Sequence, residues 1–283
     1  MAKIQIITDA GADLSREDME NYGIDVIPIK IISGNNEYLS GVDMFSDEIY
    51  KLLEECDEIP HTSQPSTAEI YDVLIKHIKA GKQILAITLS SKASGLHNNM
   101  HIAKNMILEE YPDAVIEILD TQRFSYTYGL PVILASEMAK DGKEIPEIVA
   151  EITRFMDEHD VVFVPKTLAY LEKGGRINKA SLVFGNLLDI VPILSLRNGL
   201  VEAIGKLRGR KKLAKKLFAY LTETIPDQSG NEFLIISGRM DEEVAEITEL
   251  LKEKYENVTF RYAKVGPTIA THIGPVFAVY YKK

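Results

Sequence analysis

The segment Lys3–Gly23, KIQIITDAGADLSREDMENYG, combines a strand, a glycine-containing turn and a helix. The β-branched run Lys3–Thr8 predicts a strand, and a helix is expected from Ser15 to a stop at Gly23. The same order returns at Gln83–Leu89, an apolar run that is followed by a polar loop and a helical pattern. Strands that alternate with helices predict a mostly parallel sheet with right-handed crossovers.

The rest of the first half continues this alternation. Ile24–Ile32 reads as a strand that contains Pro28, so we expect it at a sheet edge or with a bulge. Ser66 and Glu69 form a capping box at the start of a helix. Further helices are expected at Ser46–Glu55, Gly129–Lys140 and Pro146–Glu158, and a further strand at Val115–Leu119.

A polar break at residues 157–160 separates a second pattern. Asn198-Gly199 is a strong hairpin signal between Ile190–Leu196 and Leu200–Ile204, and a hairpin combined with crossovers predicts a mixed sheet. Other expected strands are Val161–Val164, Glu232–Ser237, Val258–Tyr262 and Val276–Tyr281, and the expected helices are Lys211–Thr222 and Asp241–Lys254. The sequence therefore predicts an α/β fold with a parallel-sheet domain at residues 1–158 and a mixed-sheet domain at residues 159–283.

Composition excludes several classes of protein. The 283 residues are 46% hydrophobic and 26% charged, which fits one large or two ordinary folded domains. The formal net charge of -10 argues against general nucleic-acid binding, because phosphate contacts require a basic face. Cys56 is the only cysteine, so an intrachain disulfide and a multi-cysteine zinc site are excluded. With no signal-peptide pattern and no apolar run near the ~20 residues of a membrane span, we expect a cytoplasmic protein.

The common motifs of nucleotide, metal and hydrolase chemistry do not occur. The sequence contains no phosphate loop, no G-x-G-x-x-G after the first strand, no H-E-x-x-H and no G-x-S-x-G. His97 and His101 lie four residues apart on an expected helix and could share a metal, but no third ligand has a suitable spacing. We therefore expect two surface histidines, no metal and no cofactor.

Polar segments follow the carboxyl ends of the expected strands, at Thr8–Asp13, Ser90–Gly95 and Asp120-Thr121. Ligands of open α/β sheets bind at this edge, where hydroxyls and helix N-terminal N–H groups suit an anion. Each segment alone is explained by helix capping, whereas several on one edge favour a binding site.

Three further places carry groups that suit an anion. Thr62 and Ser63 precede the capping box and remain free to donate to a ligand. The glycine pair before Arg176 should end a helix and leave this arginine on a sharp turn. Two Gly-Pro pairs enclose His272 in what we expect to be a rigid turn, where the ring can donate a hydrogen bond or act as an acid or base. A satisfied core histidine is the alternative.

Lys206–Lys216, KLRGRKKLAKK, is a dense basic stretch in an acidic chain, and a helix is expected to begin within it. Cations are unfavourable at a helix N-terminus, so a bound anion or acidic partner would offset them, and a solvated helix face is the alternative. We expect Arg208, Arg210 and Lys211 to dock an acidic partner or to contact an anionic membrane transiently.

Six segments, in this order, resemble the DegV family of fatty-acid-binding proteins, of the FakB type that forms the binding subunit of fatty acid kinase. They are IITDAGADLS at Ile6–Ser15, TSQPS at Thr62–Ser66, SSKASG at Ser90–Gly95, LAYLEKGGRI at Leu168–Ile177, KLRGRKK at Lys206–Lys212 and VGPTIATHIGP at Val265–Pro275. The resemblance covers essentially the whole chain. It implies an N-terminal parallel α/β domain and a C-terminal mixed-sheet domain.

The resemblance also implies a lipid carrier rather than an enzyme. One long-chain fatty acid would have its acyl chain inside and its carboxyl group near the domain junction, where a separate kinase would convert it to an acyl phosphate for phospholipid synthesis. Thr62 and Ser94 would bind the carboxylate, and His272 would complete the network. Secondary headgroup candidates are Ser63, Ser91 and Arg176. No nucleic acid is implied as a partner.

Four residues, Leu96, Lys166, Val191 and Val276, depart from the family pattern, and the bulk of Leu96 and Val276 is expected to alter the cavity entrance. The apolar wall is expected from Phe163 and from residues 182–188 and 190–194.

Two other classes of function stay open. One is an acyl hydrolase with Ser94 as nucleophile and His272 as base, since a nucleophile needs a base within hydrogen-bond reach. The other is a nucleic-acid-binding module that uses the basic stretch.

Overall fold

The strand–turn–helix units of the first half assemble into a four-stranded parallel sheet. The computed structural model describes residues 3–177 and 190–283. The strands of this sheet are β1 (Ile4–Asp9), β2 (Asp25–Ile27), β6 (Gln83–Thr88) and β7 (Ile116–Asp120). Their order is β2-β1-β6-β7 and every pair is parallel, which confirms the predicted sheet type.

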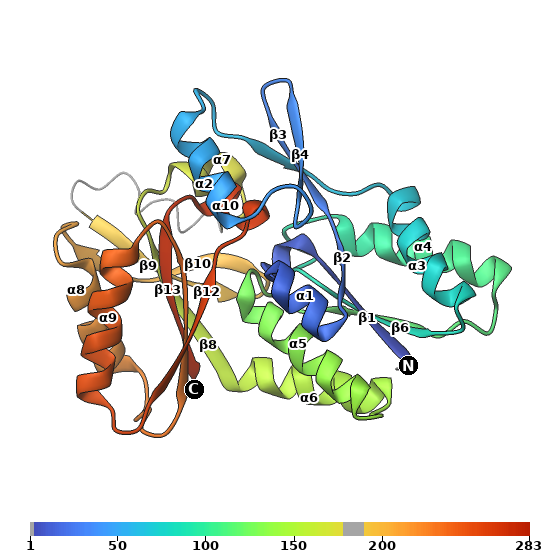
Figure 1. Ribbon diagram of the computed structural model, residues 1–283. Coiled ribbons are helices and arrows are strands. Elements are labelled where there is room, and N and C mark those ends of the chain that lie inside the picture. The colour runs from blue at the N-terminus through green and yellow to red at the C-terminus, as the bar shows by residue number, and fades with distance from the viewer. Residues whose placement is uncertain (1–2, 178–189) are drawn as a thin grey trace.

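Five helices cover the two faces of this sheet. They are α1 (Arg16–Tyr22), α3 (Thr67–Lys79), α4 (Leu96–Glu110), α5 (Tyr126–Lys140) and α6 (Ile145–Glu158). Figure 1 shows α3 and α4 on one face and α1, α5 and α6 on the other. Ser15 caps α1 and Ser66 caps α3, each in a capping box, as the sequence predicts.

A small antiparallel sheet interrupts the expected alternation. It consists of β3 (Ile29–Ser33), β4 (Asn36–Ser40) and β5 (His61–Ser63) in the order β4-β3-β5, and α2 (Ser46–Glu55) lies between β4 and β5 in the chain. The single strand expected at Ile24–Ile32 is therefore wrong. Proline has no N–H to give to a ladder, so the chain leaves the parallel sheet at Pro28 and starts a new one. β2 lies at the edge of the parallel sheet, as predicted for this segment.

The second half forms a six-stranded mixed sheet. Its strands are β8 (His159–Pro165), β9 (Ile190–Arg197), β10 (Leu200–Arg208), β11 (Glu232–Gly238), β12 (Thr259–Lys264) and β13 (Val276–Lys282). The order is β10-β9-β8-β13-β11-β12, and only β11 and β12 pair in parallel. Its helices are α7 (Ala169–Gly174), α8 (Leu213–Thr224), α9 (Asp241–Lys254) and α10 (Pro267–Ile273). The two-domain α/β fold class is confirmed.

The two faces of the mixed sheet serve different cores. Alternate strand residues such as Val162 and Val279 pack under α8 and α9, while Phe163 and Ala278 join the core of the first half. The mixed sheet begins at His159, but a boundary at residue 158 stays a prediction because this core is continuous across it. Within the described residues, no helix is long and apolar enough to cross a membrane.

Candidate ligand site at the junction of the two halves

A cavity of about 550 Å³ lies between the mixed sheet and the loops that follow β6 and β7. This volume falls within the range of small-molecule sites. Its wall is mainly apolar. Most of the apolar side chains come from strands of the mixed sheet and from α10; they include Val161, Phe163, Ile236, Ile273, Val276 and Ala278. The polar lining residues include all six side chains that the sequence singled out for a headgroup: Thr62, Ser63, Ser91, Ser94, Arg176 and His272.

Thr62 and His272 meet although they are 210 residues apart in the chain. Thr62 Oγ1 lies 2.9 Å from His272 Nε2. The small antiparallel sheet makes this contact, because β5 pairs with β3 and α10 packs against both strands. The prediction of a rigid turn around His272 is wrong, because this segment is helical. Pro267, with its preset φ, instead starts the short helix α10, which ends at Gly274.

Burial and hydrogen bonding determine the charge of His272 and guide the assignment of its tautomer. Burial, together with the positive charge of Arg176, lowers the pKa of His272 to about 4, so the ring is neutral at pH 7. Nδ1 is buried without a hydrogen-bond partner, and a Cβ built on Gly174 would lie 2.6 Å from it. We assign the ring proton to Nε2, which donates to Thr62 Oγ1. The hydroxyl proton of Thr62 is then free for a ligand.

Ser94 and Arg176 lie on facing loops. Ser94 Oγ accepts from Leu96 N at 3.2 Å at the start of α4, so its hydroxyl proton also remains free. As predicted, Gly175 ends α7 in the left-handed conformation. Arg176 Nε donates to Ala93 O at 3.2 Å, and its Nη1 donates to the carbonyl of Gly174. This arginine therefore joins α7 to the loop that carries Ser94.

The two secondary serines differ in what they can donate. Ser63 makes no side-chain hydrogen bond within the described part of the chain and keeps its proton. Ser91 Oγ donates to Asp120 Oδ2 at 2.5 Å, which leaves no proton for a ligand in this arrangement. Sequence reasoning missed Lys92, an exposed residue that also lines the cavity. Its position inside the segment Ser90–Gly95 was the available signal.

The charges of the cavity wall favour an anion. Among the described lining residues there are two cations, Arg176 and Lys92, and no aspartate or glutamate. The whole chain has 42 acidic and 32 basic residues, so this wall is opposite in sign to the protein. Neither cation has a carboxylate partner within residues 3–177 and 190–283.

The segment Thr8–Asp13 is not part of the cavity, contrary to its expected place on the binding edge. Asp9 is fully buried and accepts hydrogen bonds from Gly11 N, Leu89 N and Tyr128 Oη at 2.8–2.9 Å. Burial raises the pKa of Asp9 to about 6. This carboxylate instead ties the end of β1 to the end of β6 and to α5.

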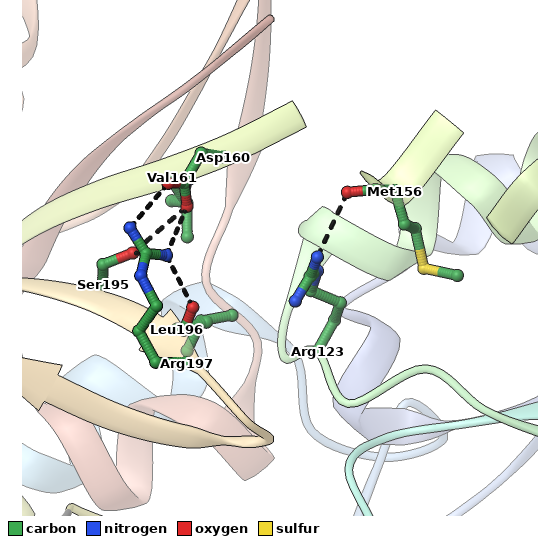
Figure 2. Close-up of polar contacts among 7 residues, drawn as sticks. All are labelled: Arg123, Met156, Asp160, Val161, Ser195, Leu196 and Arg197. Carbon is green, nitrogen blue, oxygen red and sulfur yellow. Dashed lines mark hydrogen bonds and ion pairs between the residues drawn. The ribbon is translucent and has the colours of Figure 1, made fainter. Parts of the chain in front are cut away.

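Polar contacts hold strand ends and loops that also carry lining residues of the cavity, and Figure 2 shows those of Arg197 and Arg123. Arg197 binds both carboxylate oxygens of Asp160 at 2.7 and 2.8 Å, which joins β8 and β9 next to lining residues of the wall. Ser195 Oγ completes this cluster. Arg123 Nη2 donates to Met156 O at 3.1 Å and so fixes the loop after β7 against the end of α6.

The basic stretch lies outside the cavity lining. Arg208 belongs to β10, and α8 begins at Leu213, so a helix begins within Lys206–Lys216 as predicted, two residues after the expected start at Lys211. Arg208, Arg210 and Lys211 are exposed, and within the described residues none of them forms an ion pair. Arg210 donates to Lys166 O at 2.5 Å, next to the start of α7.

The four departures from the family pattern fall in different places. Val276 lines the cavity, whereas Leu96 is buried behind it in α4. An effect of Leu96 on the lining itself is therefore not expected. Val191 packs in the core under α8 and α9, and Lys166 is exposed. Of the expected apolar wall, Phe163 lines the cavity and residues 182–188 lie outside the described residues. Residues 190–194 do not line it, and Val191 and Ile193 pack in the core under α8 and α9.

The Ser94–His272 dyad of the hydrolase hypothesis finds no support in the geometry. The Nε2 atom of His272 is engaged with Thr62, and no hydrogen bond joins Ser94 and His272. Its Nδ1 atom faces Gly174.

Fold and site together define a two-domain α/β protein whose apolar cavity carries hydrogen-bond donors on part of its wall. A model of the DegV family, described as uncharacterised proteins, matches residues 3–283. The chain belongs to the DegV family.

Similar proteins are known at the level of both sequence and structure. A fatty acid-binding protein of Thermotoga maritima is 32% identical over 280 residues, with 96% of this chain and 95% of that protein covered. A DegV family structure from Thermus thermophilus, described by its fatty acid binding, has a TM-score of 0.85 and 28% identity over 99% of this chain and 100% of that one. A stearic acid-binding protein from Eubacterium ventriosum has a TM-score of 0.85 and 27% identity, covering 100% and 99%.

Proposed function

We propose that this protein binds one long-chain fatty acid and presents its carboxyl group to a fatty acid kinase for acyl-phosphate formation. The observation that carries the proposal is a 550 Å³ apolar cavity on whose wall Thr62, Ser94, Arg176 and His272 gather. The protein would act in the cytoplasm as a carrier, with catalysis in the partner.

The energetics of the cavity suit an acyl chain. Burial of roughly 14 methylenes contributes about 11 kcal/mol, at ~0.8 kcal/mol each. Ordering and association cost on the order of 4–15 kcal/mol. Burial of the acyl chain alone therefore leaves little net binding free energy. An unpaired buried carboxylate would remove it. Tight binding therefore depends on donors for the carboxylate.

Thr62, Ser94 and Arg176 are the candidates for these donors. With the ring proton of His272 on Nε2, the hydroxyl proton of Thr62 faces away from the ring, and Ser94 offers a second proton. Arg176 supplies the counter-charge from its place beside Ala93. The relatives named above are described as binding fatty acids, one of them stearic acid, which supports this ligand class.

Ser94→Ala is expected to weaken fatty-acid binding about 10- to 100-fold, because a hydrogen bond to a charged group contributes about 1.5–3 kcal/mol. Mass spectrometry of the organic extract from purified protein tests this. We expect about one fatty acid per chain in the wild type and loss of it in the variant. Ser91→Ala is the matched control in the same loop and should retain the lipid, since the Ser91 hydroxyl serves Asp120. Wild-type protein that takes up no lipid from a fatty-acid mixture would refute the carrier function.

The kinase part of the proposal rests on the exposed cations Arg208, Arg210 and Lys211, of which Arg210 contacts the backbone of Lys166 just before α7. The combined change Arg208→Glu, Arg210→Glu and Lys211→Glu should lower the rate of fatty-acid phosphorylation by a cognate kinase and leave lipid content unchanged, because reversed charge at a docking surface slows association. The rate is measured with lipid-loaded protein at low and at physiological salt. A phosphorylation rate equal to that of the wild type would exclude this docking surface.

A further inference from the structure

Two histidines on α4 have ring nitrogens that face each other. The Nε2 atoms of His97 and His101 lie 3.2 Å apart, and the ring planes cross at 67°. Residues four apart are neighbours on one helix face. His97 is partly buried and His101 is exposed, so the pair is open to solvent.

A buried threonine contacts the second ring nitrogen of His97. Thr88 is fully buried, and its Oγ1 donates to Leu119 O at 3.2 Å and lies 2.9 Å from His97 Nδ1. When the Thr88 hydroxyl donates to Leu119 O, it accepts from Nδ1–H of His97. In this arrangement Nε2 of His97 keeps the lone pair that a metal ion needs, on the side that faces His101.

The spacing of the two nitrogens matches a chelate. Nitrogens that each lie 2.0–2.1 Å from a tetrahedral zinc ion are about 3.3 Å apart. A hydrogen bond on the second ring nitrogen, as Thr88 provides, is the usual support of a metal-binding histidine. The described residues contain no cluster of three or more ligating side chains, so water would fill the remaining positions.

We propose that His97 and His101 form a two-imidazole site for a divalent transition-metal ion of the zinc and copper group, the class that imidazole ligands select over magnesium and calcium. The sequence shows only the spacing of four. The facing Nε2 atoms and the support from Thr88 are features of the fold. The site lies outside the ligand cavity and does not depend on fatty-acid binding.

Isothermal titration of untagged, chelator-treated full-length protein with zinc chloride tests the site. We expect one Zn²⁺ per chain, no response to magnesium chloride, and loss of zinc binding in His101→Asn. His61→Asn, at the other exposed histidine, is the control and should bind zinc as the wild type does. Thr88→Val should weaken zinc binding about 10-fold or more, because it removes the hydrogen bond between Thr88 and Nδ1 of the metal-binding His97.

Two outcomes would overturn the proposal. Wild-type protein that does not bind zinc at one per chain would leave the two rings as a simple hydrogen-bonded pair. Zinc binding that survives unchanged in His101→Asn would place the ion elsewhere on the protein.

Discussion

Replacing Ala278 with phenylalanine is expected to abolish tight binding of long-chain fatty acids while the protein stays folded. Ala278 is buried on β13, in register with Phe163 on β8 and Ile236 on β11, and all three line the cavity. A phenyl ring at this position enters the 550 Å³ cavity. If the ring displaces about five methylenes, binding weakens by about 4 kcal/mol, on the order of 1000-fold.

Val279→Leu, one residue further along β13, provides the control. Val279 faces the core under α8 and α9, where an added methylene has no free space. We expect this variant to keep its lipid and to lose thermal stability, whereas Ala278→Phe should lose its lipid and keep its melting temperature in the lipid-free state. The two are compared by titration with a fluorescent fatty acid and by thermal unfolding of delipidated protein. Retained affinity in Ala278→Phe would show that the acyl chain lies elsewhere.

Replacing Arg176 with methionine is expected to weaken fatty-acid binding by a factor of 30 or more. Removal of one partner from a buried charge pair costs about 2–5 kcal/mol, because the other charge stays buried and unpaired. The effect should be specific for the carboxylate. A fatty alcohol of equal chain length has no charge to pair, so its affinity should change far less.

The comparison with a fatty alcohol separates recognition of the carboxylate by Arg176 from the structural role of this arginine in the surrounding loops. Arg176 also holds the carbonyls of Ala93 and Gly174, and a purely structural loss would weaken the acid and the alcohol equally. Equal weakening would therefore remove Arg176 from the headgroup site. Arg210→Met is the matched arginine control, since Arg210 is exposed and contacts the backbone of Lys166 outside the cavity.

Local sequence signals predicted most of the secondary structure. Ser15 and Ser66 start helices, Gly23 ends one, and Asn198-Gly199 turns a hairpin, because caps and turns depend on residues a few positions apart. The small sheet of β3, β4 and β5 escaped prediction, since its strands are short and their pairing depends on Pro28 and on long-range contacts.

The residue types of the candidate site were visible in the sequence, but their roles were not. Thr62, Ser94, Arg176 and His272 were each marked by a polar segment or a glycine signal, and the fold brings all four to one cavity. Ser91 and Ser94 lie in one polar segment, and only the contact with Asp120 shows that the Ser91 proton is already used. The segment Thr8–Asp13 looked like a ligand loop, whereas Asp9 is a buried link between strands.

By itself, the sequence determined the parallel and mixed sheets and the residues that can bind an anion, because periodicity, caps and side-chain chemistry are local properties. Only the tertiary structure decided that Thr62 on β5 contacts His272 on α10, that His272 Nδ1 is buried without a hydrogen-bond partner, and that the described cavity lining contains no acidic residue. These features depend on contacts between segments up to 210 residues apart. Such contacts form only when distant strands and helices pack together, and no local sequence pattern encodes them.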